Sequence, residues 1–540
     1  MASQARAPAN SFKSSEPSPR AYLVGGGIAS LAAAVFMIRD GDMLGHDITI
    51  LEQSGKIGGS LDGAGSAQDG YVLRGGRMLE SKYLCTFALF SSIPTLDESQ
   101  TVTQEITQWN ETMHTSSDSR LFRDGHRQTA PKFGLSEKHI LTLERLALEP
   151  ERLLDGSTIA DQFDAAFLQT DFWFMWCTTF AFQPWHSAIE FKRYLERFIH
   201  MVDGFNRLRG ILRTRYNQYD SMVRPLHKWL EARGVRFEMN TRVTDIGFTQ
   251  RDGKSCVENI TVHRSGATAE ITVRPQDHVL ITLGSMTEAS TLGAMDQAPA
   301  LGSKTDGGAW TLWEKIAAGR PEFGNPAVFA DHIDQSKWVS FTTTLHNPTM
   351  LRLIRDLTGN VPGEGGLITF PNSSWLASIV VPHQPHFIGQ PEGVDVFWGY
   401  GLAVDKIGDF VKKPMSACSG REIMTEILGH LRITAEAATI LESCICIPCM
   451  MPFITSQFLP RERGDRPAVL PIGTQNLAFI GQFCEVPDDV VFTVEYSVRS
   501  AQLAVYGLLG LQLVPPAVYK GKFDPSVLAK AFRALHDIGA

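Results

Sequence analysis

The stretch that most constrains the fold of this chain lies at residues 21–52, where strand, helix and strand patterns follow one another. An apolar run at 22–24 enters a turn of three glycines. An apolar helical pattern follows at 28–38, and a second apolar run at 48–51 ends in Glu52. This order, with glycines at the first turn, is the dinucleotide-binding βαβ fingerprint. We therefore predict an α/β protein with a Rossmann-like nucleotide-binding domain.

The residues of this fingerprint have separate roles. Gly25 permits the tight turn, and Gly27 lets the backbone approach a pyrophosphate, which then faces the amide donors of the helix that begins at Ile28. Ser30 stands where a third glycine is usual, and its small side chain still allows close packing of helix on strand. Glu52 is placed to accept a hydrogen bond from a ribose hydroxyl. An adenine dinucleotide is the predicted ligand.

Later segments favour FAD over NAD. Apolar strands are predicted at 277–283 and 477–480, the second is followed by a helix at 493–509, and no second glycine fingerprint occurs. A single fingerprint with a late closing strand is typical of one tightly held flavin. The expected cofactor-binding residues are Gly25, Gly27, Ile28, Ser30, Glu52, Gly59, Ser60, Gly75, Gly76, Arg77, Val243, Ser285, Gly481, Asp489 and Ser497.

The length of 540 residues exceeds what one hydrophobic core normally supports. We predict an FAD-binding domain from the discontinuous segments 21–83, 220–290 and 470–512. An inserted α+β substrate-binding domain would comprise 84–219 and 291–469. Residues 1–20 are rich in Ser, Pro and Ala and predict a disordered leader, with a transit peptide as the alternative. The tail 513–540 predicts an amphipathic helix that lies on an anionic membrane surface or packs on its own domain.

Composition excludes several functional classes. A net charge of −8 gives no support for nucleic-acid binding. No segment reaches the roughly 20 apolar residues that cross a bilayer, so we expect a cytoplasmic protein with peripheral membrane association as an extension. Eight scattered cysteines suit reduced thiols. Cys444, Cys446 and Cys449 resemble half a zinc site, but the sequence offers no second pair of ligands nearby, and we predict no metal.

An aromatic passage lies at 171–205. Phe191, Tyr194 and Phe198 recur at three- and four-residue spacing, which predicts one face of a helix. Most of these rings are expected to form an aromatic core. Tyr194 differs because a buried phenol needs a hydrogen-bond partner.

Six motifs together resemble one known family, the oleate hydratases. They are RGGRMLESKY, WHSAIEFKRYLERFIH, RYNQYDSMV, PHQPHF, CMMPFITSQFLPR and FTVEYSVRSA, and the similarity runs from about residue 20 to the end. The resemblance implies addition of water to a cis double bond of a long-chain unsaturated fatty acid, such as oleate to 10-hydroxystearate and also linoleate. It further implies a requirement for FAD without net redox change.

The resemblance also implies roles for individual residues, with two departures from the family pattern. Tyr194 matches the proton donor. Met78 stands where relatives carry a water-activating glutamate, and Glu80 is the candidate substitute. Gln218 and His386 match ligands of the substrate carboxylate. The remaining family threonine and asparagine are replaced by Val380 and Pro382, for which His383 is a candidate compensation.

Two other functional classes remain open at this point. The first is a flavin-dependent lipid oxidoreductase or isomerase. The second is a non-catalytic lipid-binding protein, for which Met78, Val380 and Pro382 are the best arguments. We expect an oligomer, with a dimer as the specific prediction.

Overall fold

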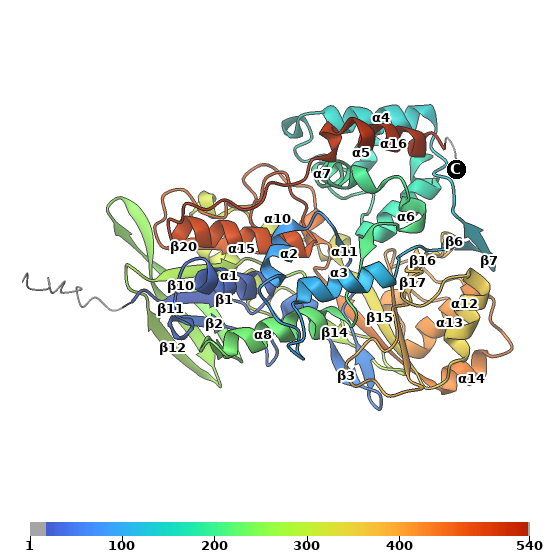
Figure 1. The fold of residues 1–540 in the computed structure, drawn as a ribbon, viewed down its shortest axis with the longest axis horizontal. Coiled ribbons are helices and arrows are strands. Elements are labelled where there is room, and N and C mark those ends of the chain that lie inside the picture. The colour runs from blue at the N-terminus through green and yellow to red at the C-terminus, as the bar shows by residue number, and fades with distance from the viewer. Residues whose placement is uncertain (1–17, 538–540) are drawn as a thin grey trace, which may run out of the picture.

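A parallel sheet organises one half of the computed structural model, which describes residues 18–537 (Figure 1). The sheet has the order β20-β13-β1-β2-β9, so strands from three distant parts of the chain lie side by side. Its strands are β1 (Ala21–Val24), β2 (Ile48–Leu51), β9 (Arg236–Glu238), β13 (His278–Thr282) and β20 (Leu477–Ile480). Of the leader predicted at 1–20, all but residues 18–20 lies outside the described residues.

Helix α1 (Ile28–Arg39) follows β1 and joins it to the parallel strand β2. Its alanines at 32, 33 and 34 are fully buried. Small side chains allow α1 to approach both the sheet and α15 (Val494–Leu508), which packs against it. The predicted Rossmann-like βαβ unit and the late closing strand are thereby confirmed.

The second half of the molecule is built on a larger, mostly antiparallel sheet, on the right in Figure 1. Its order is β14-β19-β15-β18-β17-β16-β6-β7. The strands are β6 (Ser119–Arg123), β7 (His126–Thr129), β14 (Thr291–Leu292), β15 (Trp338–Leu345), β16 (Leu367–Thr369), β17 (Ala377–Val380), β18 (Asp395–Gly401) and β19 (Cys444–Met451). All eight residues of β15 are buried, so this strand lies in the centre of the core.

A group of helices lies above this sheet in Figure 1, where the C-terminal helix joins helices from the middle of the chain. These are α4 (Glu137–Leu148), α6 (Asp171–Phe180), α7 (Ala188–Phe198) and α16 (Pro525–Leu535). Helix α16 packs against the short turn Ile199–Met201 that follows α7. The predicted C-terminal helical region is therefore present, beside the aromatic helix α7.

Smaller elements connect and extend the two sheets. The antiparallel strands β10 (Thr241–Arg251), β11 (Lys254–Arg264) and β12 (Ala267–Thr272) form a separate sheet beside the parallel one. Other elements are α2 (Leu84–Phe90), α3 (Val102–Thr112), α8 (Arg224–Glu231), α9 (Ala309–Ala317), α12 (Thr349–Thr358), α13 (Gly420–Leu431), β4 (Gly70–Val72) and β8 (Ile211–Leu212). Within residues 18–537, no helix combines the length and apolar character that a bilayer crossing demands.

Candidate active site

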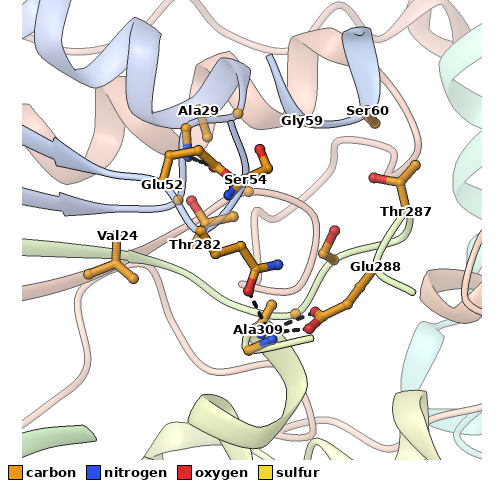
Figure 2. A pocket seen from close by; sticks show the side chains of 18 of the residues that line it. Val24, Ala29, Glu52, Ser54, Gly59, Ser60, Thr282, Thr287, Glu288 and Ala309 are labelled. Carbon is orange, nitrogen blue, oxygen red and sulfur yellow. Dashed lines mark hydrogen bonds between the residues drawn. The ribbon is translucent and has the colours of Figure 1, made fainter. Parts of the chain in front are cut away.

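Two cavities are relevant to the site, and the first, of about 400 Å³, lies at the carboxyl ends of the parallel strands (Figure 2). Its walls come from the turn between β1 and α1, the ends of β2, β13 and β20, and the start of α9. Ligand pockets commonly measure 300–1,000 Å³, and in open α/β sheets they lie at this end of the strands. The cavity therefore has the position and size of a nucleotide site.

The glycine turn shapes this cavity with backbone atoms. Gly25 adopts a φ of +93°, a conformation that other residues rarely take. A Cβ added to Gly27 would meet no protein atom within 4 Å, which leaves room for a ligand against the backbone. Glu52 accepts a hydrogen bond from the Gly26 N–H at 2.6 Å and another from the Ser54 N–H at 2.7 Å. The turn and its acid thus fit a dinucleotide, and Glu52 also fixes the turn.

Most of the predicted cofactor-binding residues lie at this cavity, but not all. Those that line it are Gly25, Gly27, Ile28, Glu52, Gly59, Ser60, Val243, Ser285, Gly481 and Ser497. Ser30 is buried behind the turn, 3.4 Å from the Thr282 hydroxyl, and Asp489 is buried in an ion pair with Arg499. Ser30 and Asp489 line no part of this cavity, and the cofactor-binding roles of all these residues stay predictions.

Glu288 is a residue of this cavity that the sequence analysis missed. Its carboxylate accepts the Ala309 N–H at 2.9 Å, at the start of α9, as Figure 2 shows. Burial raises the pKa of Glu288 to about 7, although the hydrogen bond from Ala309 opposes the shift. No motif signals this residue, since its position depends on the meeting of the loop after β13 with α9.

The loop at 74–77 separates this cavity from a second one. Arg74 lines the first cavity and forms an ion pair with Asp62 at 2.7 Å, whereas Gly75, Gly76 and Arg77 line the second. A Cβ on Gly76 would lie 2.7 Å from the Trp398 indole, so glycine permits the close approach of this loop to β18. The expectation that Gly75, Gly76 and Arg77 bind the cofactor stays a prediction.

The strand before this loop is tied to the large sheet. The Tyr71 and Leu73 N–H groups donate to the Thr344 and Thr342 hydroxyls of β15, at 2.8 and 2.9 Å. On the other side of the loop, the Arg77 guanidinium stacks 5.0 Å from the Phe492 ring, and burial lowers the pKa of Arg77 to about 10. The loop is therefore a fixed wall between the two cavities.

The second cavity, of about 80 Å³, brings together the residues that family resemblance assigns to the substrate. Met78, Gln218, His383 and His386 line it, and so do Val380 and Pro382. The Gln218 amide donates to the Gly75 carbonyl at 2.7 Å, so it also holds the wall in place. Burial, followed by the charge of Arg213, lowers the pKa of His386 to about 3, and burial also lowers the pKa of His383. Both imidazoles are neutral at physiological pH.

Tyr194 lies on α7 with its ring among other aromatic rings, as predicted. It contacts Phe180, Phe182 and Phe458, and its hydroxyl donates to the Val491 carbonyl at 2.6 Å. Burial raises the pKa of Tyr194 well above its ordinary value, and the charge of Arg77 opposes this shift without reversing it. Tyr194 lines neither cavity. Its hydroxyl is bound beside Phe492, which does line the second one.

Buried ion pairs hold α7 in position. Glu190 pairs with Arg461 at 3.0 Å and Arg466 at 2.8 Å, and Arg197 pairs with Glu80 at 2.8 Å. Burial alone would raise the pKa of Glu80, but the His200 hydrogen bond and the Arg197 charge together lower it. Glu80 lines neither cavity, and its carboxylate pairs instead with Arg197 of α7.

Two groups of metal-type side chains lie elsewhere. Cys444, Cys446 and Cys449 belong to strand β19, and burial raises the pKa of the Cys449 thiol to about 12. Asp409, Glu426 and His430 place donor atoms within 4.8 Å of one another. However, Glu426 already accepts the N–H groups of residues 409, 410 and 411. This carboxylate closes a loop, and the sequence analysis did not anticipate the cluster.

Comparison with known proteins gives relatives over nearly the whole chain. The MCRA family model matches residues 18–506. An oleate hydratase of Streptococcus pyogenes serotype M49 (strain NZ131) is 40% identical over 529 residues, covering 96% of this chain and 90% of the relative. A linoleate hydratase of Lactiplantibacillus plantarum is 34% identical over 566 residues, covering 96% and 98%.

Solved structures resemble the fold at much lower identity. Cyclohexylamine oxidase from Brevibacterium oxydans IH-35A matches with a TM-score of 0.54 and 12% identity, over 92% of this chain and 99% of that one. An oxidoreductase from Methanosarcina mazei matches with a TM-score of 0.50 and 12% identity, over 91% and 100%. At this identity the likeness concerns the fold alone.

Proposed function

The chain belongs to the MCRA family, and we propose that it adds water to a cis double bond of a long-chain unsaturated fatty acid, with oleate and linoleate as substrates. The names of the two relatives support this reaction. The observation that carries it is the second cavity, where the expected substrate residues meet beside a nucleotide-type site. The shared wall at 74–77 would bring the fatty acid and a nucleotide into one active site.

FAD is the proposed cofactor. The open backbone at Gly27, the acid Glu52 and the 400 Å³ cavity fit its dinucleotide part, and Gly59, Val243 and Ser497 would contact it from other segments. Bound FAD would supply a planar polar ring, and hydration requires no electrons from it. Arg74, which is fixed by Asp62, would keep a positive charge in this cavity.

Tyr194 is the proposed proton donor. Its O–H bond would break as a C–H bond forms at one alkene carbon, and a water oxygen would bond to the other carbon. The proton of that water would then return to the phenolate oxygen, which regenerates Tyr194. The pKa of Tyr194 is raised by burial and by the nearby Tyr83, Glu190 and Asp489. The charge of Arg77 opposes this shift, and Arg77 would be the group that stabilises the phenolate.

Access of the substrate to Tyr194 requires movement of Phe492. This residue lines the second cavity and has a φ of 69°, a strained conformation for a bulky side chain. The adjacent Val491 carbonyl accepts the Tyr194 hydrogen bond. We propose that displacement of this segment frees the phenol and enlarges the cavity, whose 80 Å³ is below the usual range for ligand sites.

The water has no carboxylate base at Met78, which lines the cavity but cannot accept a proton. Glu80 is held by Arg197 and His200, and its lowered pKa makes it a weak base. We therefore propose that Glu80 acts through Arg197 to position α7. The water would be oriented by polar groups such as the Gly75 and Gly76 backbone and would lose its proton to the phenolate.

The apolar chain supplies most of the binding free energy. At about 0.8 kcal/mol per buried CH₂, about a dozen methylene groups offer roughly 10 kcal/mol before ordering costs. Trp338, Trp398 and Phe492 provide apolar walls for it. The head group then decides which double bond reaches Tyr194.

Reaction of oleate in heavy-oxygen water, followed by mass spectrometry, tests the function. We expect a hydroxy acid that carries the heavy oxygen, formed without an electron acceptor. Product without label, or bleaching of the flavin at the rate of turnover, would instead support a lipid oxidoreductase or isomerase. Tight binding without product would support the lipid-binding alternative.

Further features of the protein remain proposals. We propose that α16 lies on an anionic membrane, because the neighbouring Phe523 is 74% exposed and Phe532 on the helix 50% exposed, and because Lys530 and Arg533 of the helix are exposed as well. Sedimentation with anionic vesicles, compared with neutral ones, tests this contact. We retain three further predictions: a cytoplasmic location, a dimer, and domains divided at the predicted boundaries.

A further inference from the structure

Arg213 is a cation without a partner in the second cavity. It follows strand β8 and lines the cavity beside His386. Within residues 18–537, its Nε and Nη2 atoms are buried and have no hydrogen-bond partner. Burial lowers the pKa of Arg213 to about 10, without a carboxylate among the causes to oppose the shift.

The surrounding structure holds this side chain in place. The Arg213 N–H donates to the Asn110 amide oxygen at 2.9 Å, and the Asn110 amide donates back to the Arg213 carbonyl at 2.8 Å. A Cβ on Gly366 would clash with Nη2 of Arg213, so glycine at 366 makes room for the guanidinium. A side chain accommodated in this way, yet unpaired, points to a ligand that supplies the missing acceptors.

The other lining groups make the cavity suitable for an anion. Arg77 and Arg213 both line it, and no Asp or Glu among residues 18–537 does. Since His383 and His386 have lowered pKa values, they contribute no positive charge at neutral pH. Val380 has no side-chain donor for a carboxylate.

The two arginines occupy different parts of the site. Arg77 contacts the Met286 sulfur at 3.8 Å, and Met286 lines the nucleotide cavity. Arg77 therefore belongs to the wall between the cavities. Arg213 instead lies against Gly366, and together with His386 it lines the second cavity and not the first.

We propose that the Arg213 guanidinium binds the carboxylate of the fatty acid and thereby sets which double bond reaches Tyr194. The proposal rests on the proposed function and names the group that recognises the acid end of the substrate. A guanidinium presents a planar fork of donors that matches a carboxylate in a bidentate manner. An unpaired buried charge is costly, and a bound carboxylate would remove that cost.

The test compares oleate with oleyl alcohol, which has the same chain without the charge, in equilibrium binding to the flavin-loaded protein. The variants are Arg213→Gln, Arg213→Lys and, as the matched control, Arg209→Gln, which removes an exposed arginine from the same segment. Truncating one partner of a buried charge pair commonly costs 2 kcal/mol or more. Arg213→Gln should therefore weaken oleate binding about 30-fold or more and leave alcohol binding within about threefold.

Arg213→Lys should restore part of the preference for the acid, and Arg209→Gln should bind like the unmodified protein. The KM for oleate should rise more than kcat falls in Arg213→Gln, since the contact is equal in ground and transition states. Equal affinity of the unmodified protein for acid and alcohol would overturn the proposal even if the variants do not fold. So would unchanged oleate binding by a folded Arg213→Gln variant.

The two proposals can fail separately. A protein that forms no labelled hydroxy acid from oleate but loses oleate binding in Arg213→Gln would refute the hydratase function and retain the carboxylate site. An active protein whose Arg213→Gln variant binds oleate normally would refute the carboxylate site alone.

Discussion

The two cavities of this protein are made in different ways. The first cavity, which is the proposed nucleotide site, is shaped mainly by the backbone at the ends of parallel strands, with glycines at 25 and 27 and with Glu52 holding the turn. The substrate cavity is shaped by side chains from segments far apart in sequence, such as Met78, Arg213 and Trp398. A backbone site tolerates few substitutions at its glycines, whereas a side-chain site can change its chemistry one residue at a time. Met78, Val380 and Pro382, which the family resemblance marks as departures from the usual pattern, all line the second cavity.

The largest expected effect is a loss of hydration activity without a loss of flavin, in the variant Tyr194→Phe. Tyr194→Phe removes the proposed proton but keeps the ring contacts of α7, and general acid catalysis typically contributes about 10²–10⁴-fold. We expect hydration of oleate to fall by that factor while flavin content stays unchanged. Product formation is measured by mass spectrometry and flavin by absorbance. Tyr506→Phe, on α15 away from the aromatic cluster, is the control with normal turnover per flavin.

Glu288 is an exception to the difference between the two cavities, because it is a titratable side chain in the cavity that is built mainly from backbone. Its pKa is raised from 4.5 to about 7 in the folded state. The stability that it contributes is therefore present below pH 4.5 and lost as the pH rises through about 7. Glu288→Gln should raise the free energy of unfolding of the flavin-free protein at pH 8 by up to about 3 kcal/mol.

The same variant should change little at about pH 3, where Glu288 is protonated in both the folded and the unfolded state. Denaturant titrations at the two pH values measure the difference. An equal change in stability at both would show that the carboxyl does not titrate in this window. It would also mean that no titrating side chain needs to be added to the description of the first cavity as a site built from backbone.

A smaller effect is expected at Gly27, where a substitution should weaken cofactor binding without changing stability. A Cβ there meets no protein atom within 4 Å, so Gly27→Ala should leave the melting temperature of the flavin-free protein unchanged. A cofactor packed on that backbone would meet the new methyl, and overpacking costs about 1–3 kcal/mol. We expect roughly tenfold weaker FAD binding in fluorescence titrations. Unchanged affinity would place the cofactor away from the glycine turn.

The smallest expected effect is at Met78. Because its thioether does no proton transfer, Met78→Leu should conserve volume and keep activity within about threefold. Steady-state kinetics with oleate measure this. A loss as large as that in Tyr194→Phe would show that the sulfur has a specific role, and would contradict the view that this cavity tolerates exchange of its apolar side chains.

The sequence predicted the features that depend on local pattern. The βαβ unit, the strand at 477–480 and the helix around 493–509 lie where they were expected, because each has its own periodicity and end signals. The family assignment is confirmed by the match over residues 18–506. The fold class is confirmed by the parallel sheet, while the identity of the flavin is still a proposal.

Other features depend on tertiary contacts and had no sequence signal. Glu288 acquires its raised pKa from burial, at a position set by the hydrogen bond from Ala309 at the start of α9. Two guanidinium nitrogens of Arg213 have no hydrogen-bond partner, and no carboxylate is among the groups that shift its pKa. Glu80 stands two residues from Met78, yet the short strand at 79–80 takes it toward Arg197 and away from the substrate cavity. Proximity in sequence was a poor guide to proximity in the site.

The wall at 74–77 has a thermodynamic consequence. Its residues face both cavities, and hydrogen bonds to Thr342 and Thr344 fix the strand that leads into it. If a ligand in one cavity shifts this wall, the affinity of the other cavity must change by a definite factor. Reciprocity requires the same factor in the opposite direction. Fatty acid that tightens the hold on the nucleotide would therefore be bound more tightly, by an equal ratio, once the nucleotide is in place.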